Sequence, residues 1–194
     1  MVANPQDVRM TVDEWRELER TSEVKHEYID GYVYAMAGGT GAHSMVADNI
    51  TGAVNAALGD GPCLAHGSDL ATRVSESRFY YADVVVSCSE RDRPTRAMTE
   101  VTEPRGVFEV LSESTERTDR GRKARDYRNC PTLQEYVLVS TEYQLVEVYR
   151  RTEDGWSIVH FCGADDTVEL ASLGVRFSVA VAYRHTDVPV QPPE

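Results

Sequence analysis

Long apolar runs are missing from this chain of 194 residues. No stretch approaches the ~18 consecutive apolar residues that a transmembrane helix needs. The first ten residues are polar and lack the apolar segment of a secretory signal peptide. Cysteine is scarce as well, with four residues and no CxxC pair. These absences argue against a membrane span, a disulfide framework and a structural zinc site, and they predict a cytoplasmic protein with free thiols.

The signatures of several enzyme classes are also missing. Neither G-x-S-x-G nor H-E-x-x-H occurs, so a serine hydrolase and a zinc protease have no motif support. The glycine run from Gly38 to Gly41 matches neither G-x-x-x-x-G-K-[ST] nor G-x-G-x-x-G, which favours a connector between a hairpin and a helix over a phosphate cradle. His43, close behind this run, is interpreted either as a cap or core histidine or as a side chain that points into a site.

Positive charge is in the minority, with 20 basic against 32 acidic residues and a net charge of −12. This acidity argues against a protein that binds nucleic acid over its whole surface, but it leaves room for a local basic patch. The composition is otherwise that of an ordinary globular chain, which excludes a mainly disordered protein, a collagen and a coiled coil. The length suits one domain, so we predict an N-terminal extension over 1–10, a single domain over 11–185 and a loose tail over 186–194.

Local patterns predict a mixed α/β (α+β) fold with a mixed central sheet, flanking helices and added β-hairpins. A capping box from Thr11 to Glu14 predicts a short helix, and Asp30-Gly31 predicts a hairpin turn within 25–37. A four-residue apolar spacing predicts a helix over 43–58. Further helix is expected over 115–129, and strands over 70–74, 79–87, 107–111, 135–140, 145–151, 156–161 and 175–183.

Three acids interrupt otherwise apolar strands: Glu27, Asp83 and Glu109. For any one of them, a position that faces solvent is the simpler interpretation. Two acids on adjacent core strands are harder to explain this way, because Asp83 and Glu109 would repel each other unless a cation lies between them. Oxygen ligands of this kind suit Mg²⁺ or Mn²⁺ rather than zinc.

The segment 117–128 carries the clearest contrast in charge. It holds six basic and two acidic residues, a local charge of +4 in a chain of −12. A solvated helix face explains this as well as a strip that meets phosphates does. Lys123 is one of only two lysines, beside 18 arginines, and a compact ammonium can act where a guanidinium does not fit. Tyr127 lies on the same helical face as Lys123.

Four segments together resemble the Uma2 family (DUF820) of the PD-(D/E)XK restriction-endonuclease-like superfamily. They are His26-Glu-Tyr-Ile-Asp-Gly, Tyr81-Ala-Asp-Val-Val-Val, Phe108-Glu-Val-Leu-Ser with the following Ser114-Thr-Glu-Arg-x-Asp-Arg-Gly-x-Lys-x-x-Asp-Tyr, and Pro131-x-Leu-x-Glu-Tyr-Val-Leu-Val. The resemblance runs from about residue 10 to 183, in the same order throughout, and the third segment is its most specific part.

The resemblance implies a restriction-endonuclease-like core and a metal-dependent endonuclease that cuts nucleic acid, with DNA expected. Asp83 and Glu109 match the two motif acids and, with the Val110 carbonyl, would hold Mg²⁺ (or Mn²⁺). Two positions depart from the motif: Ala82 replaces the proline, and Leu111 stands where the lysine is usual. Lys123 would be the migrated lysine.

Further residues are implied with less support. Glu27 would be an additional acid of the site, and four residues are candidates for contacts with substrate phosphates: Arg120, Arg122, Tyr127 and His43. A homodimer is expected, because members of the superfamily often dimerise. The alternative is a catalytically silent protein that keeps the nuclease fold and acts as a binding or interaction module.

Overall fold

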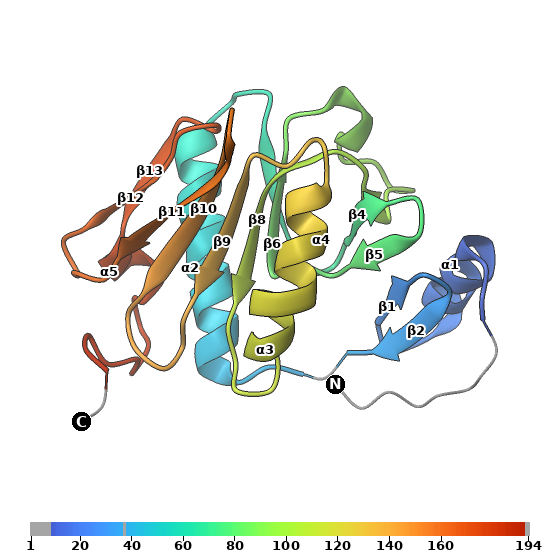
Figure 1. Cartoon of the computed structure of the whole chain (residues 1–194), viewed down its shortest axis with the longest axis horizontal. Helices are drawn as coiled ribbons and strands as arrows, with labels where there is room; N and C mark the ends of the chain where they lie inside the picture. Colours follow the sequence, from blue (N-terminus) through green and yellow to red (C-terminus); the bar gives the residue numbers. More distant parts are fainter. Residues whose placement is uncertain (1–8, 37, 193–194) are drawn as a thin grey trace.

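The structure is a computed structural model that describes residues 9–36 and 38–192, so nearly all of the predicted N-terminal extension lies outside it. Its centre is a six-stranded sheet in the order β11-β10-β9-β8-β6-β3 (Figure 1). Only β8 and β9 are parallel, and the other neighbours are antiparallel. The strands span Leu64–Gly67 (β3), Val84–Ser87 (β6), Pro104–Val110 (β8), Glu135–Val139 (β9), Val146–Thr152 (β10) and Gly155–Phe161 (β11). The predicted mixed central sheet is therefore confirmed.

A second sheet, in the order β2-β1-β5-β4-β7, lies beside the first (Figure 1). Its strands span His26–Ile29 (β1), Tyr32–Ala35 (β2), Ala71–Ser75 (β4), Arg78–Tyr80 (β5) and Glu100–Val101 (β7), and helix α1 (Val12–Thr21) lies next to it. The capping box of α1 and the β1–β2 hairpin form as predicted. Asp30 and Gly31 both take positive φ angles, which explains why this pair makes the turn.

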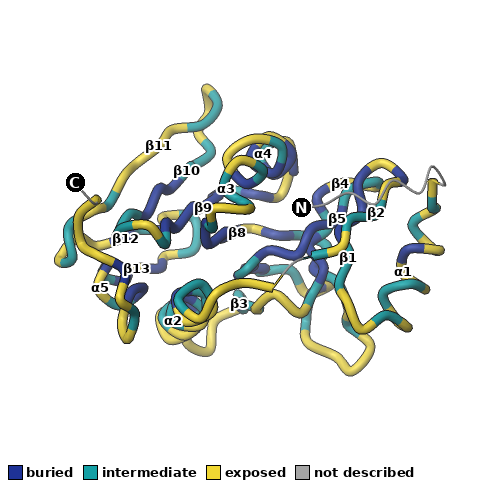
Figure 2. The backbone as a smooth tube through the Cα atoms, turned by 90° about the horizontal axis from the view of Figure 1, so that it is seen from below, coloured by how far each residue is buried: buried dark blue, intermediate teal, exposed yellow. Residues whose placement is uncertain are grey.

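Helices cover both faces of the six-stranded sheet (Figure 2). Helix α2 (Gly41–Leu58) packs on one face through Val46, Ile50 and Val54, all fully buried. The other face is covered by α3 (Glu116–Thr118), the π-helical turn η2 (Asp119–Lys123) and α4 (Ala124–Asn129). A two-stranded sheet of β12 (Thr167–Leu170) and β13 (Val175–Ser178), followed by α5 (Val179–Ala182), completes the core on the α2 side.

Several predicted elements differ from the structure in their limits. The expected strand 79–87 is two strands, because the chain leaves the second sheet after β5 and enters the first at β6. The expected helix 115–129 contains a π-helical turn, and the expected strand 175–183 turns into α5 after Ser178. Part of the predicted loose tail is packed, since Val188 is 6% exposed and its carbonyl accepts a hydrogen bond from Gln144.

The prediction of free thiols is wrong for two of the four cysteines, because Cys63 and Cys88 form a disulfide. Leu64 pairs with Ser87 in the β3–β6 ladder, which brings the flanking cysteines opposite each other although they lie 25 residues apart in the sequence. Cys130 and Cys162 stay free. Within 9–36 and 38–192, no helix is long and apolar enough to cross a membrane.

Candidate functional site

Asp83 and Glu109 lie close together, as the sequence predicted, because Glu109 is in β8 and Asp83 immediately precedes the neighbouring strand β6. Val84 pairs with Phe108 in the antiparallel β6–β8 ladder, so Asp83, just before Val84, lies opposite Glu109, just after Phe108. Asp83 Oδ2 accepts a hydrogen bond of 2.7 Å from the backbone N–H of Val110. Asp83 lies where the chain passes from the second sheet, after β5, to the first sheet at β6.

Lys123 reaches from the π-helical turn into a group of buried carboxylates. Its Nζ lies 3.1 Å from Glu109 Oε1, 3.1 Å from Glu27 Oε1 and 3.5 Å from Asp119 Oδ1. The lysine is 5% exposed and each of these acids 2%. We call Lys123 with Glu27, Asp83, Glu109 and Asp119 the carboxylate cluster. The structure thus brings together the four predicted catalytic residues.

Asp119 is the member of the cluster that the sequence analysis missed. The available signal is its position, four residues before Lys123, which places both side chains on one face of the helix. Asp119 and Lys123 are the first and last residues of the π-helical turn. The Tyr136 hydroxyl stabilises the start of this turn by donating a hydrogen bond of 2.9 Å to the Asp119 carbonyl. Single π-helical turns of this kind are frequent at functional sites.

The electrostatics of the cluster follow from four acids that share one lysine. Burial, with a further contribution from the neighbouring acids, raises the pKa of Glu109 well above its usual range, although Lys123 acts in the opposite direction. Burial alone would lower the pKa of Lys123, but Glu109, Glu27 and Asp119 together hold it well above its usual range. The Lys123 ammonium is therefore charged at neutral pH.

The donor set fits a hard divalent cation. Among the residues that the structure describes, no three His, Cys, Asp or Glu side chains converge closely enough to hold an ion. The predicted ligand set, however, needs only two side chains, because its third donor is the Val110 carbonyl. All three donors are oxygens, as Mg²⁺ and Mn²⁺ prefer. Two buried oxygens of the cluster, Glu27 Oε2 and Asp119 Oδ1, have no hydrogen-bond partner.

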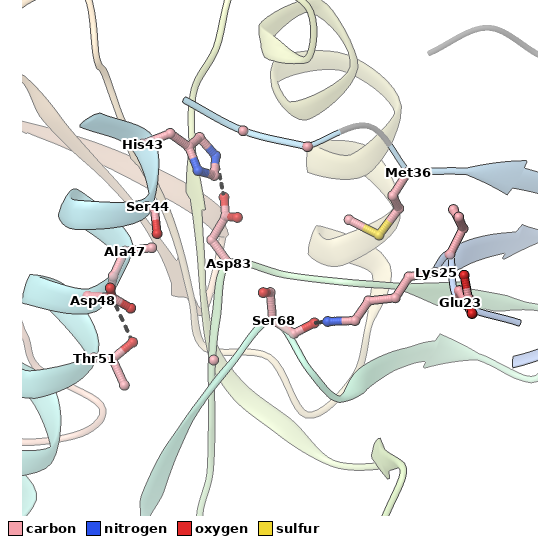
Figure 3. A pocket seen from close by; sticks show the side chains of 14 residues that line it. Glu23, Lys25, Met36, His43, Ser44, Ala47, Asp48, Thr51, Ser68 and Asp83 are labelled. Carbon is pink, nitrogen blue, oxygen red and sulfur yellow. Dashed lines mark hydrogen bonds and ion pairs between the residues drawn. The ribbon is translucent and has the colours of Figure 1, made fainter. Parts of the chain in front are cut away.

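A cavity of about 580 Å³ opens beside Asp83, between the start of α2, the glycine run and the turn after β3. His43 and Asp83 face each other across its wall (Figure 3), with His43 Nε2 3.3 Å from Asp83 Oδ2. This hydrogen bond raises the pKa of His43 against the opposing effect of burial. On another wall, Lys25 donates a hydrogen bond of 2.9 Å to the Ser68 carbonyl. Asp83 is the member of the carboxylate cluster that lines this cavity.

The four residues predicted to contact phosphates do not share one surface. His43 lines the cavity. Arg120 instead pairs with Glu116 at 2.6 Å and with Glu147 at 2.5 Å. The Arg122 guanidinium lies 5.1 Å from the centre of the Tyr34 ring. Tyr127 is fully buried among the rings of Tyr80 and Tyr136, so its side chain faces the core.

Comparison with known proteins gives a family match over residues 12–182, to Uma2, described as "Putative restriction endonuclease". Two relatives from Synechocystis are similar along most of their length. The uncharacterized protein slr1290 is 38% identical over 178 residues, 91% of this chain and 92% of the relative. The uncharacterized protein sll1609 is 28% identical over 168 residues, 86% of this chain and 95% of the relative.

A crystal structure from Anabaena variabilis, of "a putative nuclease belonging to DUF820", matches with a TM-score of 0.73. The match covers 90% of this chain and 97% of the other at 19% sequence identity, so it speaks for the fold alone. It confirms the predicted restriction-endonuclease-like fold.

Proposed function

Because this chain belongs to the Uma2 family, we propose that it is a metal-dependent endonuclease that hydrolyses phosphodiester bonds of nucleic acid, with DNA as the substrate. The observation that carries the proposal is the carboxylate cluster. One lysine lies within 3.1 Å of two buried acids, next to an aspartate on the neighbouring strand. Burying so many like charges is unfavourable for folding, and a site for a cation explains why the sequence keeps them.

Asp83, Glu109 and the Val110 carbonyl would hold Mg²⁺ (or Mn²⁺), which would polarise the phosphodiester and acidify a bound water. Lys123 would donate a hydrogen bond that orients the attacking water and would stabilise the negative charge that develops on the phosphate. Glu27 Oε1 and Asp119 Oδ1, which lie 3.1 Å and 3.5 Å from Lys123 Nζ, would keep the ammonium in place by charge attraction. The products would be a 5′-phosphate and a 3′-hydroxyl, as the superfamily implies.

The substrate would enter through the cavity beside Asp83. Its volume of about 580 Å³ falls within the range of small-molecule pockets, which is enough for a nucleotide unit of a strand. His43 lies at its inner wall, where an imidazole can donate a hydrogen bond to a phosphate oxygen once it turns from Asp83. This is the one predicted phosphate contact whose position in the structure supports it.

A binding module that keeps the nuclease fold is the second candidate. It is favoured by the completeness of the contacts around Lys123, which three acids already surround, and by a net charge of −12 that repels a polyanion. A binding module has no need for Mn²⁺ at micromolar concentration, whereas the proposed nuclease depends on it.

Cleavage of supercoiled plasmid, single-stranded DNA and RNA, each with Mg²⁺ and with Mn²⁺, tests the proposal. We expect metal-dependent cleavage by the wild type that EDTA stops and that Asp83→Asn lowers at least a hundredfold. Equal cleavage by wild type and Asp83→Asn would place the activity elsewhere or in a contaminant. No cleavage of any substrate with either metal would favour the binding module.

A further inference from the structure

Three tyrosine rings stack in the core beside the carboxylate cluster. Tyr80 is in β5, Tyr127 in α4 and Tyr136 in β9. The centre of the Tyr127 ring lies 5.5 Å from that of Tyr80 and 5.1 Å from that of Tyr136. All three side chains are fully buried and belong to the apolar core beneath α4 (Figure 1). The rings alone account for this packing, so each buried hydroxyl needs an explanation of its own.

Two of the three hydroxyls have a hydrogen-bond partner. Tyr80 donates a hydrogen bond of 2.7 Å to Asp126 Oδ2, and Tyr136 donates one of 2.9 Å to the Asp119 carbonyl. Among the described residues, no group accepts a hydrogen bond from the Tyr127 hydroxyl. A buried hydroxyl without a partner is unfavourable for folding, and a phenylalanine would fill the same space without this penalty. The packing of the core therefore does not explain why residue 127 carries a hydroxyl.

The fold directs the Tyr127 side chain to the face of the sheet that carries Glu109. Tyr127 follows Lys123 by four residues, so both side chains lie on one face of the helix. Glu109 and Tyr136 point to the same face of the sheet, because the β8–β9 ladder pairs Tyr136 with Val107, two residues before Glu109. Lys123 contacts Glu109, and one turn later Tyr127 contacts the Tyr136 ring.

The electrostatics of Tyr127 agree with this placement. Burial raises the pKa of Tyr127 well above its usual range, and the negative charge of Glu109 raises it further, ahead of smaller contributions from Tyr136 and Glu27. Glu109 also contributes through a contact with the hydroxyl that does not reach normal hydrogen-bond geometry. The unpartnered hydroxyl thus lies beside the carboxylate that is a candidate metal ligand.

Glu109 has the acceptor atoms that this hydroxyl lacks, but Lys123 contacts both of them. Lys123 Nζ lies 3.1 Å from Glu109 Oε1 and 3.2 Å from Oε2. A carboxylate that binds a cation through one oxygen can accept a hydrogen bond at the other, and neighbouring donors commonly fix metal-binding carboxylates in this way. The Tyr127 hydroxyl is a neutral donor in the right place for this role.

We propose that Tyr127 is a positioning residue, whose hydroxyl donates a hydrogen bond to Glu109 and holds this carboxylate as a metal ligand. The inference rests on the proposed function, because Tyr127 has this role only if Glu109 binds a cation. It accounts for a hydroxyl that is unfavourable in the metal-free protein. Tyr127 then acts through Glu109 and does not touch a substrate phosphate, the contact for which the resemblance made it a candidate.

Two matched substitutions, Tyr127→Phe and Tyr80→Phe, test the inference by calorimetry with Mn²⁺ and by urea denaturation of the metal-free proteins. Each keeps its ring and removes one hydroxyl. We expect Tyr127→Phe to bind Mn²⁺ roughly tenfold more weakly than the wild type. Its urea midpoint should equal or exceed that of the wild type, because the hydroxyl has no partner to lose. Tyr80→Phe should show the reverse, a lower urea midpoint and an unchanged affinity for Mn²⁺, because Asp126 loses a donor.

A loss of metal affinity without a loss of stability is a result that a merely structural role of Tyr127 would not give. If the wild type binds Mn²⁺ and Tyr127→Phe binds it equally well, the inference is overturned and the proposed metal site stands. Equal weakening in both variants, or a urea midpoint of Tyr127→Phe as low as that of Tyr80→Phe, would also overturn the inference. If the wild type does not bind Mn²⁺, the proposed metal site fails and the inference fails with it.

Discussion

Lys123 is the residue on which the candidate site depends. Its rarity in the chain and the resemblance both pointed to it, and the structure surrounds it with acids that no local pattern in the sequence could bring together. Glu27 comes from β1 of the other sheet and Glu109 from β8, so their approach depends on how the two sheets are placed. For Asp119, the sequence offered one local indication of a place in the site, namely its position four residues before Lys123.

Substitution of Lys123 should remove cleavage even when its charge is kept. If the ammonium meets a water or a developing charge at short range, the bulk and planar shape of arginine misplace that contact. We expect Lys123→Arg and Lys123→Ala each to lose cleavage by roughly a hundredfold, ~2.7 kcal/mol, in single-turnover assays. Their affinity for Mn²⁺ should change little, because an ammonium is not a metal ligand. An active Lys123→Arg protein would remove Lys123 from the catalytic residues.

Substitution of Lys123 should lower the free energy of unfolding much more than substitution of Lys25, the other lysine of the chain. Lys123→Ala leaves three buried acids without their cation, which we expect to lower the free energy of unfolding by about 3–5 kcal/mol. Lys25→Ala removes a pair with the exposed Asp69 and should change it by ~1 kcal/mol or less. Urea denaturation of the metal-free proteins measures both. Equal effects of the two substitutions would mean that the cluster does not need its ammonium.

The raised pKa of Glu109 predicts how stability depends on pH. The folded protein keeps a proton on this acid at pH values where the unfolded chain, with an ordinary pKa of 4.5, has released it. Stability of the metal-free wild type should therefore fall as pH rises from 4.5 toward the raised pKa. In Glu109→Gln this position no longer titrates, so the free energy of unfolding of the variant should depend less on pH. At pH 8 the variant should be at least as stable as the wild type. The exposed control Glu113→Gln should follow the wild type, and a Glu109→Gln curve parallel to both would contradict the account.

At the scale of helices and strands, the sequence was sufficient to predict the elements that depend on contacts between residues close together in the chain. The capping box of α1, the Asp30-Gly31 turn and the apolar spacing of α2 all predicted what the structure contains. The break between β5 and β6 was not predictable, because a continuous apolar run does not tell where a chain changes sheets. The β3–β6 pairing, and the disulfide that follows from it, depends on contacts across 25 residues.

The disulfide should stabilise the edge formed by β3 and β6. For a loop closed across 25 residues, the loss of chain entropy in the unfolded state corresponds to about 3.5 kcal/mol. We expect Cys63→Ser with Cys88→Ser to lower the free energy of unfolding by about this amount, and reduction of the wild type to do the same. Thermal unfolding with and without a reductant measures it. A wild type that is insensitive to reductant would show that the bond does not form in solution.

At the scale of the whole molecule, the sequence combines a locally basic segment with a net charge of −12. Within the +4 segment 117–128, Lys123 is buried and Arg120 is paired with two acids, so these two charges are not free at the surface. Most of the chain's charge of −12 remains to repel a polyanionic substrate. A divalent cation at the carboxylate cluster would therefore serve binding as well as chemistry, because it lowers the negative charge where the cavity opens.

Calorimetric titration with Mn²⁺ tests most directly whether the carboxylate cluster is a metal site. We expect binding to the wild type and to the control Glu113→Gln, an exposed acid outside the cluster. Asp83→Asn and Glu109→Gln should each weaken binding at least tenfold, ~1.4 kcal/mol. Equal Mn²⁺ affinity in all four proteins, or none in the wild type, would contradict the assignment of Asp83 and Glu109 as metal ligands.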